Sequence, residues 1–150
     1  MKDKLEATYY YKDGITSSEY DTSKQLHREN GPAVEWTNGD KFWYLDGRSH
    51  RPDGPACEYA NGDKHWYEHG KRHRVGLPAM EWTNGDRYWY IDGKLHRIDG
   101  PAYEHVNGMK LWYIDGKCYD EKDFNKLIEE VKQLPLALKL TDPREWVRKL

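Results

Sequence analysis

The chain is poor in the residues that usually build a compact core. Only 37% of its 150 residues are apolar and only two are Phe, whereas seven are Trp and twelve are Tyr. A thick globular core is therefore not expected, because such cores are built mainly from aliphatic residues and Phe. Trp and Tyr suit a thin, half-exposed sheet, since each joins a large apolar body to a polar group. The composition predicts a flat or elongated body, and the length predicts a single domain.

The chain also lacks a charge excess, a long apolar run and a cysteine framework. Lys and Arg number 24 against 26 Asp and Glu, so no basic field would hold phosphates, and nucleic acid is not expected as a partner. No segment has the length and apolarity of a membrane span or the pattern of a signal peptide, so we expect a cytoplasmic protein with no membrane span. Cys57 and Cys118 are expected to be free thiols in a reducing compartment.

What the chain has instead is a repeat with a period of 23 residues. Its four copies begin as LHRENGPA at Leu26, SHRPDGPA at Ser49, RHRVGLPA at Arg72 and LHRIDGPA at Leu95. Each copy continues through Asn-Gly, Trp-Tyr and a further Gly, giving the consensus HRxDGPAxExxNGDKxWYxDGK. Residues 26–117 therefore form four repeats. Residues 1–25 are expected to hold a partial repeat, ending in the fragment Tyr10 to Gly14, and an insertion loop.

Asn-Gly between two β-prone runs predicts a β-hairpin in each repeat, because a type I′ turn needs positive φ at both central residues. With Asn38-Gly39 as a two-residue turn, Trp36 pairs with Lys41 and Glu35 pairs with Phe42. The strand period of two then sorts the side chains onto two faces. The expected packing face of the first repeat carries Val34, Trp36, Trp43 and Leu45, and the second face carries Ala33, Glu35, Phe42 and Tyr44. The ladder of equivalent tryptophans is predicted to be structural: Trp43, Trp66, Trp89 and Trp112.

Residues 118–150 are predicted to form a helical cap that covers the last repeat. Phe124, Leu127, Ile128, Val131 and Leu134 follow the spacing of one helix face. Asp120 or Asp123 is the expected N-cap, and Pro135 the expected end. A second short helix is predicted, with Asp142 as N-cap, Pro143 at its first position and Glu145 in a capping box. The predicted fold is mainly β: an extended single-sheet antiparallel meander of 23-residue β-hairpin repeats with a C-terminal α-helical cap.

The phrase WYxDGKxHRxDGPAxExxNGDKxWY resembles the MORN repeat, over about residues 26–117. It departs from that pattern in having His-Arg for His-Gly and Gly-Pro-Ala for Gly-x-Gly, so the chain resembles a divergent branch. The His-Arg-x-Asp-Gly-Pro-Ala form is also similar to small proteins of phages and giant viruses. The resemblance implies a protein-binding platform with a host-interaction role, for example inhibition of a host defence protein in the host cytoplasm. MORN arrays are also associated with binding of lipid headgroups.

The repeated His, Glu and Asp residues have two possible chemical roles besides a role in folding. Catalysis is not expected, because His, Glu and Asp recur in every repeat, whereas a catalytic site is a single constellation. A shared metal ion is not expected either, since equivalent histidines should lie roughly 10 Å apart. The histidines and the arginines that follow them are predicted to brace loops by hydrogen bonds to neighbouring Asp side chains. No cofactor, metal or catalytic residue is assigned.

The predicted function is non-enzymatic protein binding through the second face. Its carboxylates would select basic side chains, and its tyrosines would supply rigid contact area. The predicted partner-binding residues are Glu35, Phe42, Tyr44, Glu58, His65, Tyr67, Glu81, Tyr88, Tyr90 and Glu104. The alternative, in which Glu bonds Tyr or Lys within the sheet, stays open, as do homo-oligomerisation and binding of carbohydrate, choline or lipid headgroups through aromatic hairpins.

The repeats also contain irregular positions, which a fold does not require and a binding site can exploit. The third repeat has Gly76-Leu77 in place of Asp-Gly, and the second has His65, Glu68 and His69 where the others have aromatic, aliphatic and Asp residues. Neutral drift and a binding site are both compatible with this pattern.

Overall fold

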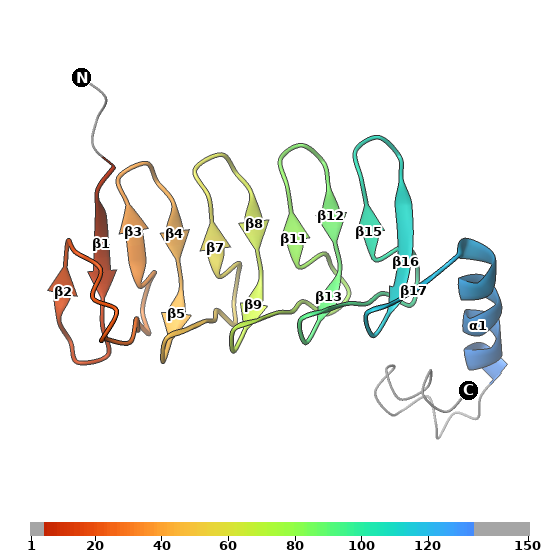
Figure 1. Ribbon diagram of the computed structural model, residues 1–150, viewed down its shortest axis with the longest axis horizontal. Helices are drawn as coiled ribbons and strands as arrows, with labels where there is room; N and C mark the ends of the chain where they lie inside the picture. Colours follow the sequence, from red (N-terminus) through yellow and green to blue (C-terminus); the bar gives the residue numbers. More distant parts are fainter. Residues whose placement is uncertain (1–4, 134–150) are drawn as a thin grey trace.

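The computed structural model describes residues 5–133 and shows a mainly β protein built around one long antiparallel sheet (Figure 1). Eleven strands lie side by side in the order β17-β16-β15-β12-β11-β8-β7-β4-β3-β1-β2. The bounds of these strands are β1 (Ala7–Tyr10), β2 (Thr16–Ser17), β3 (Val34–Trp36), β4 (Lys41–Phe42), β7 (Cys57–Glu58), β8 (Lys64–His65), β11 (Met80–Glu81), β12 (Arg87–Tyr88), β15 (Tyr103–Glu104), β16 (Lys110–Ile114) and β17 (Lys117–Tyr119). The predicted meander is confirmed, because each repeat adds two neighbouring strands to the sheet.

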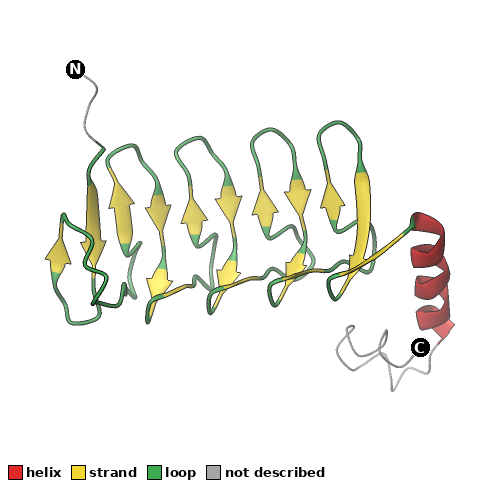
Figure 2. Ribbon diagram, viewed as in Figure 1, coloured by secondary structure: helices red, strands yellow, loops and turns green. Residues whose placement is uncertain are grey.

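Each of the first three repeats also forms a second, smaller hairpin outside the main sheet, so the expectation of one hairpin per repeat was wrong. These hairpins pair β5 (Tyr44–Leu45) with β6 (Arg48–Ser49), β9 (Tyr67–Glu68) with β10 (Lys71–Arg72) and β13 (Tyr90–Ile91) with β14 (Lys94–Leu95). In Figure 2 they lie in a row at one end of the strands of the main sheet. Asp46 and Gly47 form the first turn, with φ of 49° and 71°. Positive φ at both residues identifies the type I′ turn that the sequence placed at Asn-Gly.

The Asn-Gly loop of the main hairpin is one residue longer than predicted. The amide of Trp36 donates to the carbonyl of Asp40, and Val34 pairs with Phe42. Only Gly39 has positive φ in this loop, and the side chain of Asn38 accepts a hydrogen bond from the amide of Asp40. This is a three-residue loop in which Gly takes the left-handed position. The predicted pairs of Trp36 with Lys41 and of Glu35 with Phe42 are therefore wrong by one residue.

The shift of one residue exchanges side chains between the two faces, because strand side chains alternate. One face, the aromatic face, carries a continuous row of cross-strand partners: Tyr9, Val34, Phe42, Cys57, His65, Met80, Tyr88, Tyr103 and Leu111. The opposite face, the charged face, carries a second row: Glu35, Lys41, Glu58, Lys64, Glu81, Arg87, Glu104 and Lys110. Glu35 and Phe42, which were predicted to share a face, lie on opposite faces.

Side chains that reach the next repeat fix the spacing between repeats. The carboxylate of Asp40 accepts a hydrogen bond of 2.7 Å from the amide of Ala60, and Asp63 accepts one of 2.7 Å from Thr83. Asp86 does the same for Val106, at 2.8 Å. Met109 occupies the equivalent position in the fourth repeat, after which the described chain continues into α1 and not into a fifth repeat. The Asp of the NGD phrase is thus a link to the following repeat.

The histidines of the HR phrase hold the turns of the small hairpins. Nδ1 of His27 accepts a hydrogen bond from the amide of Asp46, at 3.1 Å, and His73 does the same for Asp92, at 3.2 Å. Nδ1 of each of these two histidines also lies 3.1 Å from the carboxylate of the same Asp. Nδ1 cannot form both bonds at once, because it either accepts from the amide or, when protonated, donates to the carboxylate. In either tautomer these two histidines brace the Asp of the small turn, in agreement with the predicted role.

The core is thin and is centred on small residues. The alanines of the Gly-Pro-Ala phrase are completely buried, with 0% exposure: Ala33, Ala56, Ala79 and Ala102. At the N-terminal end, Tyr11 and Leu26 join Ala33 and Val34 in a buried cluster. Tyr10 lies under the guanidinium of Arg28 at 3.9 Å, the place that Trp43 takes under Arg51. The fragment around Tyr10 therefore occupies the position of a preceding repeat, and part of the expected insertion loop forms β2.

The last repeat is followed by α1 (Glu121–Gln133). Asp120 caps it, since its carboxylate accepts a hydrogen bond of 2.8 Å from the amide of Asp123. Phe124 and Val131 are the buried residues of the helix, as the predicted helix face requires. Pro135 and the predicted second helix lie outside the described residues. α1 contacts β16, so it stands where a fifth repeat would continue.

Two candidate binding faces

A stacked brace recurs on the charged face of the sheet. The guanidinium of Arg51 lies 4.0 Å above the ring of Trp43 and donates a hydrogen bond of 2.7 Å to Glu58. The same NH1 group donates to the carbonyl of Pro55 at 3.2 Å. Equivalent Arg–Glu bonds occur in the other three repeats: Arg28–Glu35 at 2.6 Å, Arg74–Glu81 at 2.8 Å and Arg97–Glu104 at 3.0 Å. The four predicted contact glutamates are therefore all hydrogen-bonded within their own repeats.

These glutamates do not form an acidic surface. Across the strands each lies beside Lys41, Lys64, Arg87 or Lys110, so the charges of the row alternate in sign. Cross-strand neighbours of opposite charge stabilise a sheet modestly. A partner rich in basic side chains would meet both the row cations and the brace arginines. The arrangement supports a structural role for the glutamates, but their hydrogen-bond partner is Arg and not the Tyr or Lys of the alternative that the sequence left open.

The aromatic face carries rings in contact with one another. Phe42 packs edge-on against Tyr59, with ring centroids 5.4 Å apart, and Tyr59 packs against His65 at 5.1 Å. His65 in turn contacts Trp82 at 5.2 Å. Tyr88 and Tyr103 stack at 4.3 Å. Trp82 is 38% exposed, and most of the other rings are half-buried, so this face offers solvent-accessible aromatic surface.

The structure thus divides the predicted contact residues into two groups. Glu35, Glu58, Glu81 and Glu104 lie on the charged face, whereas Phe42, His65 and Tyr88 belong to the aromatic row. The remaining three predicted residues lie in the small hairpins: Tyr44, Tyr67 and Tyr90. Tyr44 packs with Phe42 against the buried cluster that contains Val34, so the first small hairpin borders the aromatic face. Burial is the largest cause that raises the pKa of Tyr59 on this face to about 12.

The middle of the aromatic face differs from its ends because polar groups replace apolar ones. His65 is 6% exposed, and its Nε2 atom is buried without a hydrogen-bond partner. Burial lowers the pKa of His65, the nearby charge of Arg72 lowers it further, and Asp63 acts in the opposite direction. Burial also raises the pKa of the neighbouring Cys57 thiol to about 12. At neutral pH the site therefore contains a neutral imidazole, a neutral thiol and one guanidinium.

Replacing His65 with Phe is expected to stabilise the protein, because Phe42 fills the equivalent position in the first repeat and the orphaned Nε2 is removed. The gain at neutral pH should be about 1–3 kcal/mol. It should grow as pH falls below about 6.5, since the unfolded chain then binds a proton that folded His65 resists. Urea unfolding at several pH values would measure both effects. A gain that shrinks on acidification would contradict the buried, neutral state of His65.

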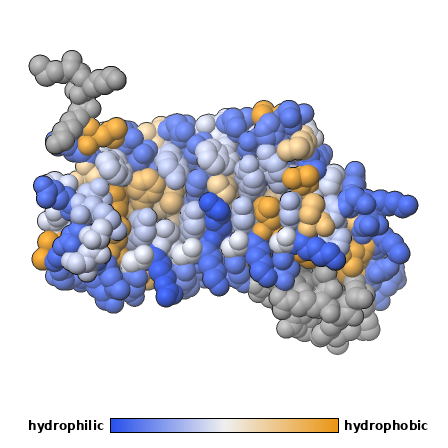
Figure 3. Space-filling view, viewed as in Figure 1, coloured by the Kyte–Doolittle hydropathy of each residue, from blue (hydrophilic) through white to orange (hydrophobic). Residues whose placement is uncertain are grey.

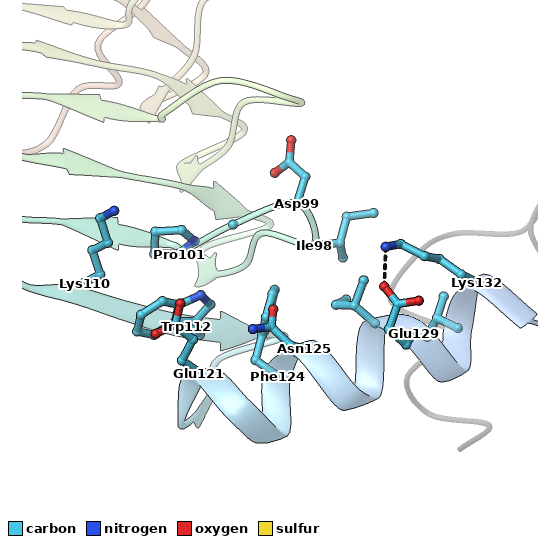
Figure 4. Close-up of a pocket in the computed structure, with 13 residues that line it drawn as sticks. Ile98, Asp99, Pro101, Lys110, Trp112, Glu121, Phe124, Asn125, Glu129 and Lys132 are labelled. Atoms are coloured by element: carbon cyan, nitrogen blue, oxygen red, sulfur yellow. Dashed lines mark hydrogen bonds and ion pairs between the residues drawn. The ribbon is translucent and has the colours of Figure 1, made fainter.

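A groove of about 590 Å³ lies between the last repeat and α1 (Figure 4). Pro101 and Trp112 line it from the sheet, and Phe124 and Asn125 line it from the helix. Beside it Lys132 contacts Glu129 at 2.5 Å. Among the described residues that line the groove, none is an arginine that would repeat the brace above Trp112. Its residues belong to the junction of the cap with the sheet, so we assign it to packing of the cap.

Other chemistry is limited in the part of the chain that the structure describes. Within residues 5–133, no group of three or more His, Cys, Asp or Glu could hold a metal ion. Cys57 is a buried free thiol, and Cys118 is an exposed one. Helix α1, the helix of this region, is too short and too polar to cross a membrane. In the view of Figure 3, hydrophobic areas form separate patches among hydrophilic side chains.

Comparisons with known protein families, with curated proteins and with solved structures found no match.

Proposed function

We propose that the chain is a non-enzymatic protein-binding module whose contact surface is the aromatic face. The observation that supports this most is the row of apolar and aromatic partners that runs across the sheet from Tyr9 to Leu111, with Trp82 exposed beside it. Rigid aromatic side chains supply large contact area at low entropic cost and are enriched at protein interfaces. The resemblance to divergent MORN repeats and to small phage and giant-virus proteins adds the proposal that the partner is a host protein.

A comparison of the two faces also supports the aromatic face as the contact surface. The charged face pairs its carboxylates with arginines and alternates its remaining charges, so it uses its polar groups internally. The aromatic face leaves large rings half-exposed. Desolvation of such rings by a partner is favourable at about 25 cal/mol per Å² of apolar area. The aromatic face therefore has more unused binding capacity than the charged face.

Two variants with opposite expected results test this proposal. A partner is first captured from host-cell lysate and identified by mass spectrometry, and its affinity is then measured for purified variants. Trp82→Ala should weaken binding about tenfold or more, as central aromatic residues of interfaces do. The double variant Glu58→Gln, Glu81→Gln should bind as the wild type does, because Gln still accepts the hydrogen bond from Arg51 or Arg74.

Thermal melting serves as the control for both variants, and each should remain folded. Loss of binding in the double Gln variant with full binding in Trp82→Ala would place the contact on the charged face. Capture of no protein, together with saturable binding on glycan, choline or lipid arrays, would replace protein binding by recognition of small headgroups.

A further inference from the structure

Arg72 is an arginine without an anion. The four arginines of the HR phrase each donate to a Glu, whereas the Arg72 guanidinium makes no hydrogen bond or ion pair with residues 5–133. Its Nε atom is buried and unpartnered. The residue as a whole is only half-buried. A guanidinium removed in part from water without a paired acceptor is costly, and folded proteins rarely keep such a group without a use.

The guanidinium of Arg72 lies near two tyrosine rings. Arg72 pairs with Tyr67 in the small hairpin, and its guanidinium carbon lies 5.8 Å from the Tyr67 ring centroid and 5.4 Å from that of Tyr90. Its charge acts on Cys57 and on His65, both members of the aromatic row. Arg72 therefore belongs to the small hairpin of Tyr67 and lies within electrostatic range of the middle of the aromatic face.

The other repeats show that the fold does not require this charge. Leu26, Ser49 and Leu95 stand where Arg72 stands, and Phe42, Tyr88 and Leu111 stand where His65 stands. The two polar departures come from consecutive repeats, yet the structure brings them together in one place. An apolar pair at these positions would be the stable solution, so the polar pair indicates a local function.

We propose that Arg72, between Tyr67 and Tyr90, is a carboxylate-binding site that takes an acidic side chain of the protein partner. The inference rests on the proposed function and names one chemical group that the aromatic face recognises. Because Nε is buried, an incoming carboxylate would meet the two terminal NH2 groups, from which the planar guanidinium can donate two parallel hydrogen bonds. The flanking tyrosines limit water around the pair and would strengthen it.

Charge favours a carboxylate over a phosphate. His65 is neutral at pH 7, since burial and Arg72 both lower its pKa, so the site offers one positive charge. Asp63, the acidic group that acts on His65, is engaged with the amide and hydroxyl of Thr83. A singly charged carboxylate balances one guanidinium, whereas phosphate recognition usually draws on a cluster of arginines.

Titration of the full-length, isotope-labelled protein by NMR tests the assignment directly. The probe is N-acetyl-glutamate α-methylamide, whose charged group is the side-chain carboxylate. The Nε–Hε signal of Arg72 and the ring signals of Tyr67 and Tyr90 should shift saturably, with a dissociation constant on the order of 1–10 mM for a single ion pair. N-acetyl-glutamine α-methylamide is the uncharged control and should leave these signals unchanged.

Substitutions at Arg72 and at its neighbour Lys71 distinguish binding at the Arg72 site from a general effect of positive charge. Arg72→Leu, which copies Leu26 and Leu95, should weaken the titration of the tyrosine signals about tenfold or more and keep or raise the melting temperature. Lys71→Gln removes an exposed charge one residue away and should titrate as the wild type does. Arg72→Gln repeats the test in a polar form, should Leu disturb the fold.

The competing results are distinct. Equal titration of Arg72→Leu and wild type, an equal shift from the glutamine derivative, or tighter binding of inorganic phosphate would each overturn the carboxylate site. If Trp82→Ala still weakens partner capture in any of those cases, the proposed protein binding stands and only the carboxylate site is refuted. A clean titration without a protein partner would refute the proposed function and retain the anion site.

Discussion

Replacing Trp89 with Ala is expected to lower the free energy of unfolding by about 3–5 kcal/mol. Trp89 is 7% exposed, and the guanidinium of Arg97 stacks on it at 4.0 Å. Loss of the ring would leave a cavity between the third and fourth repeats and uncover the arginine. Urea unfolding monitored by circular dichroism would measure the change.

Trp82→Ala is the matched control for Trp89→Ala, because it removes the same ring from the same repeat on the opposite face. Trp82 is 38% exposed, so its loss should cost clearly less. Equal losses in the two variants would mean that the brace does not carry the stability of the stack.

Phe124→Ala should have an effect of similar size, about 3–5 kcal/mol. The side chain is 3% exposed and lines the junction of α1 with the sheet together with Trp112. Without it the terminal strands β16 and β17 lose their cover, and stacked repeats need such an end to resist water. Amide hydrogen exchange should show loss of protection first in β17 and then in β16.

Leu127→Ala provides the control within the same helix, since Leu127 is half-buried and should cost less. Unchanged exchange in β16 and β17 after the Phe124 substitution would show that α1 is attached to the sheet without protecting it.

Most of the fold could be predicted because its signals are local. The 23-residue period, the β-hairpins and the Asp120 cap all follow from residues near one another in the chain. The register could not, because Asn-Gly suits both a two-residue and a three-residue loop. In the structure, the three-residue loop directs the Asp40 carboxylate to the amide of Ala60 in the next repeat. Such a contact joins two repeats, so no local sequence pattern predicts it.

The candidate site was predicted less well, and the reason is the same single residue of register. The predicted register paired Glu35 with Phe42 and so placed the carboxylates among the rings. In the structure Glu35 bonds Arg28 on the charged face. The seven-residue spacing of Arg and Glu, present in all four repeats, was a signal that could have identified the brace. Arg72 carries a weak sequence signal, because its position already varies among the other repeats, as Leu26, Ser49 and Leu95.

The links between repeats also bear on how quickly the chain can fold. Asp40 reaches a residue 20 positions along the chain, and His27 reaches one 19 positions along. Every repeat is thus joined to the next by contacts of one repeat length, so closing the whole sheet never requires two distant ends to meet. All-β proteins usually fold slowly because their contacts are distant in sequence. This chain should escape that penalty, with repeats adding one after another like a zipper and with rates that depend little on how many repeats there are.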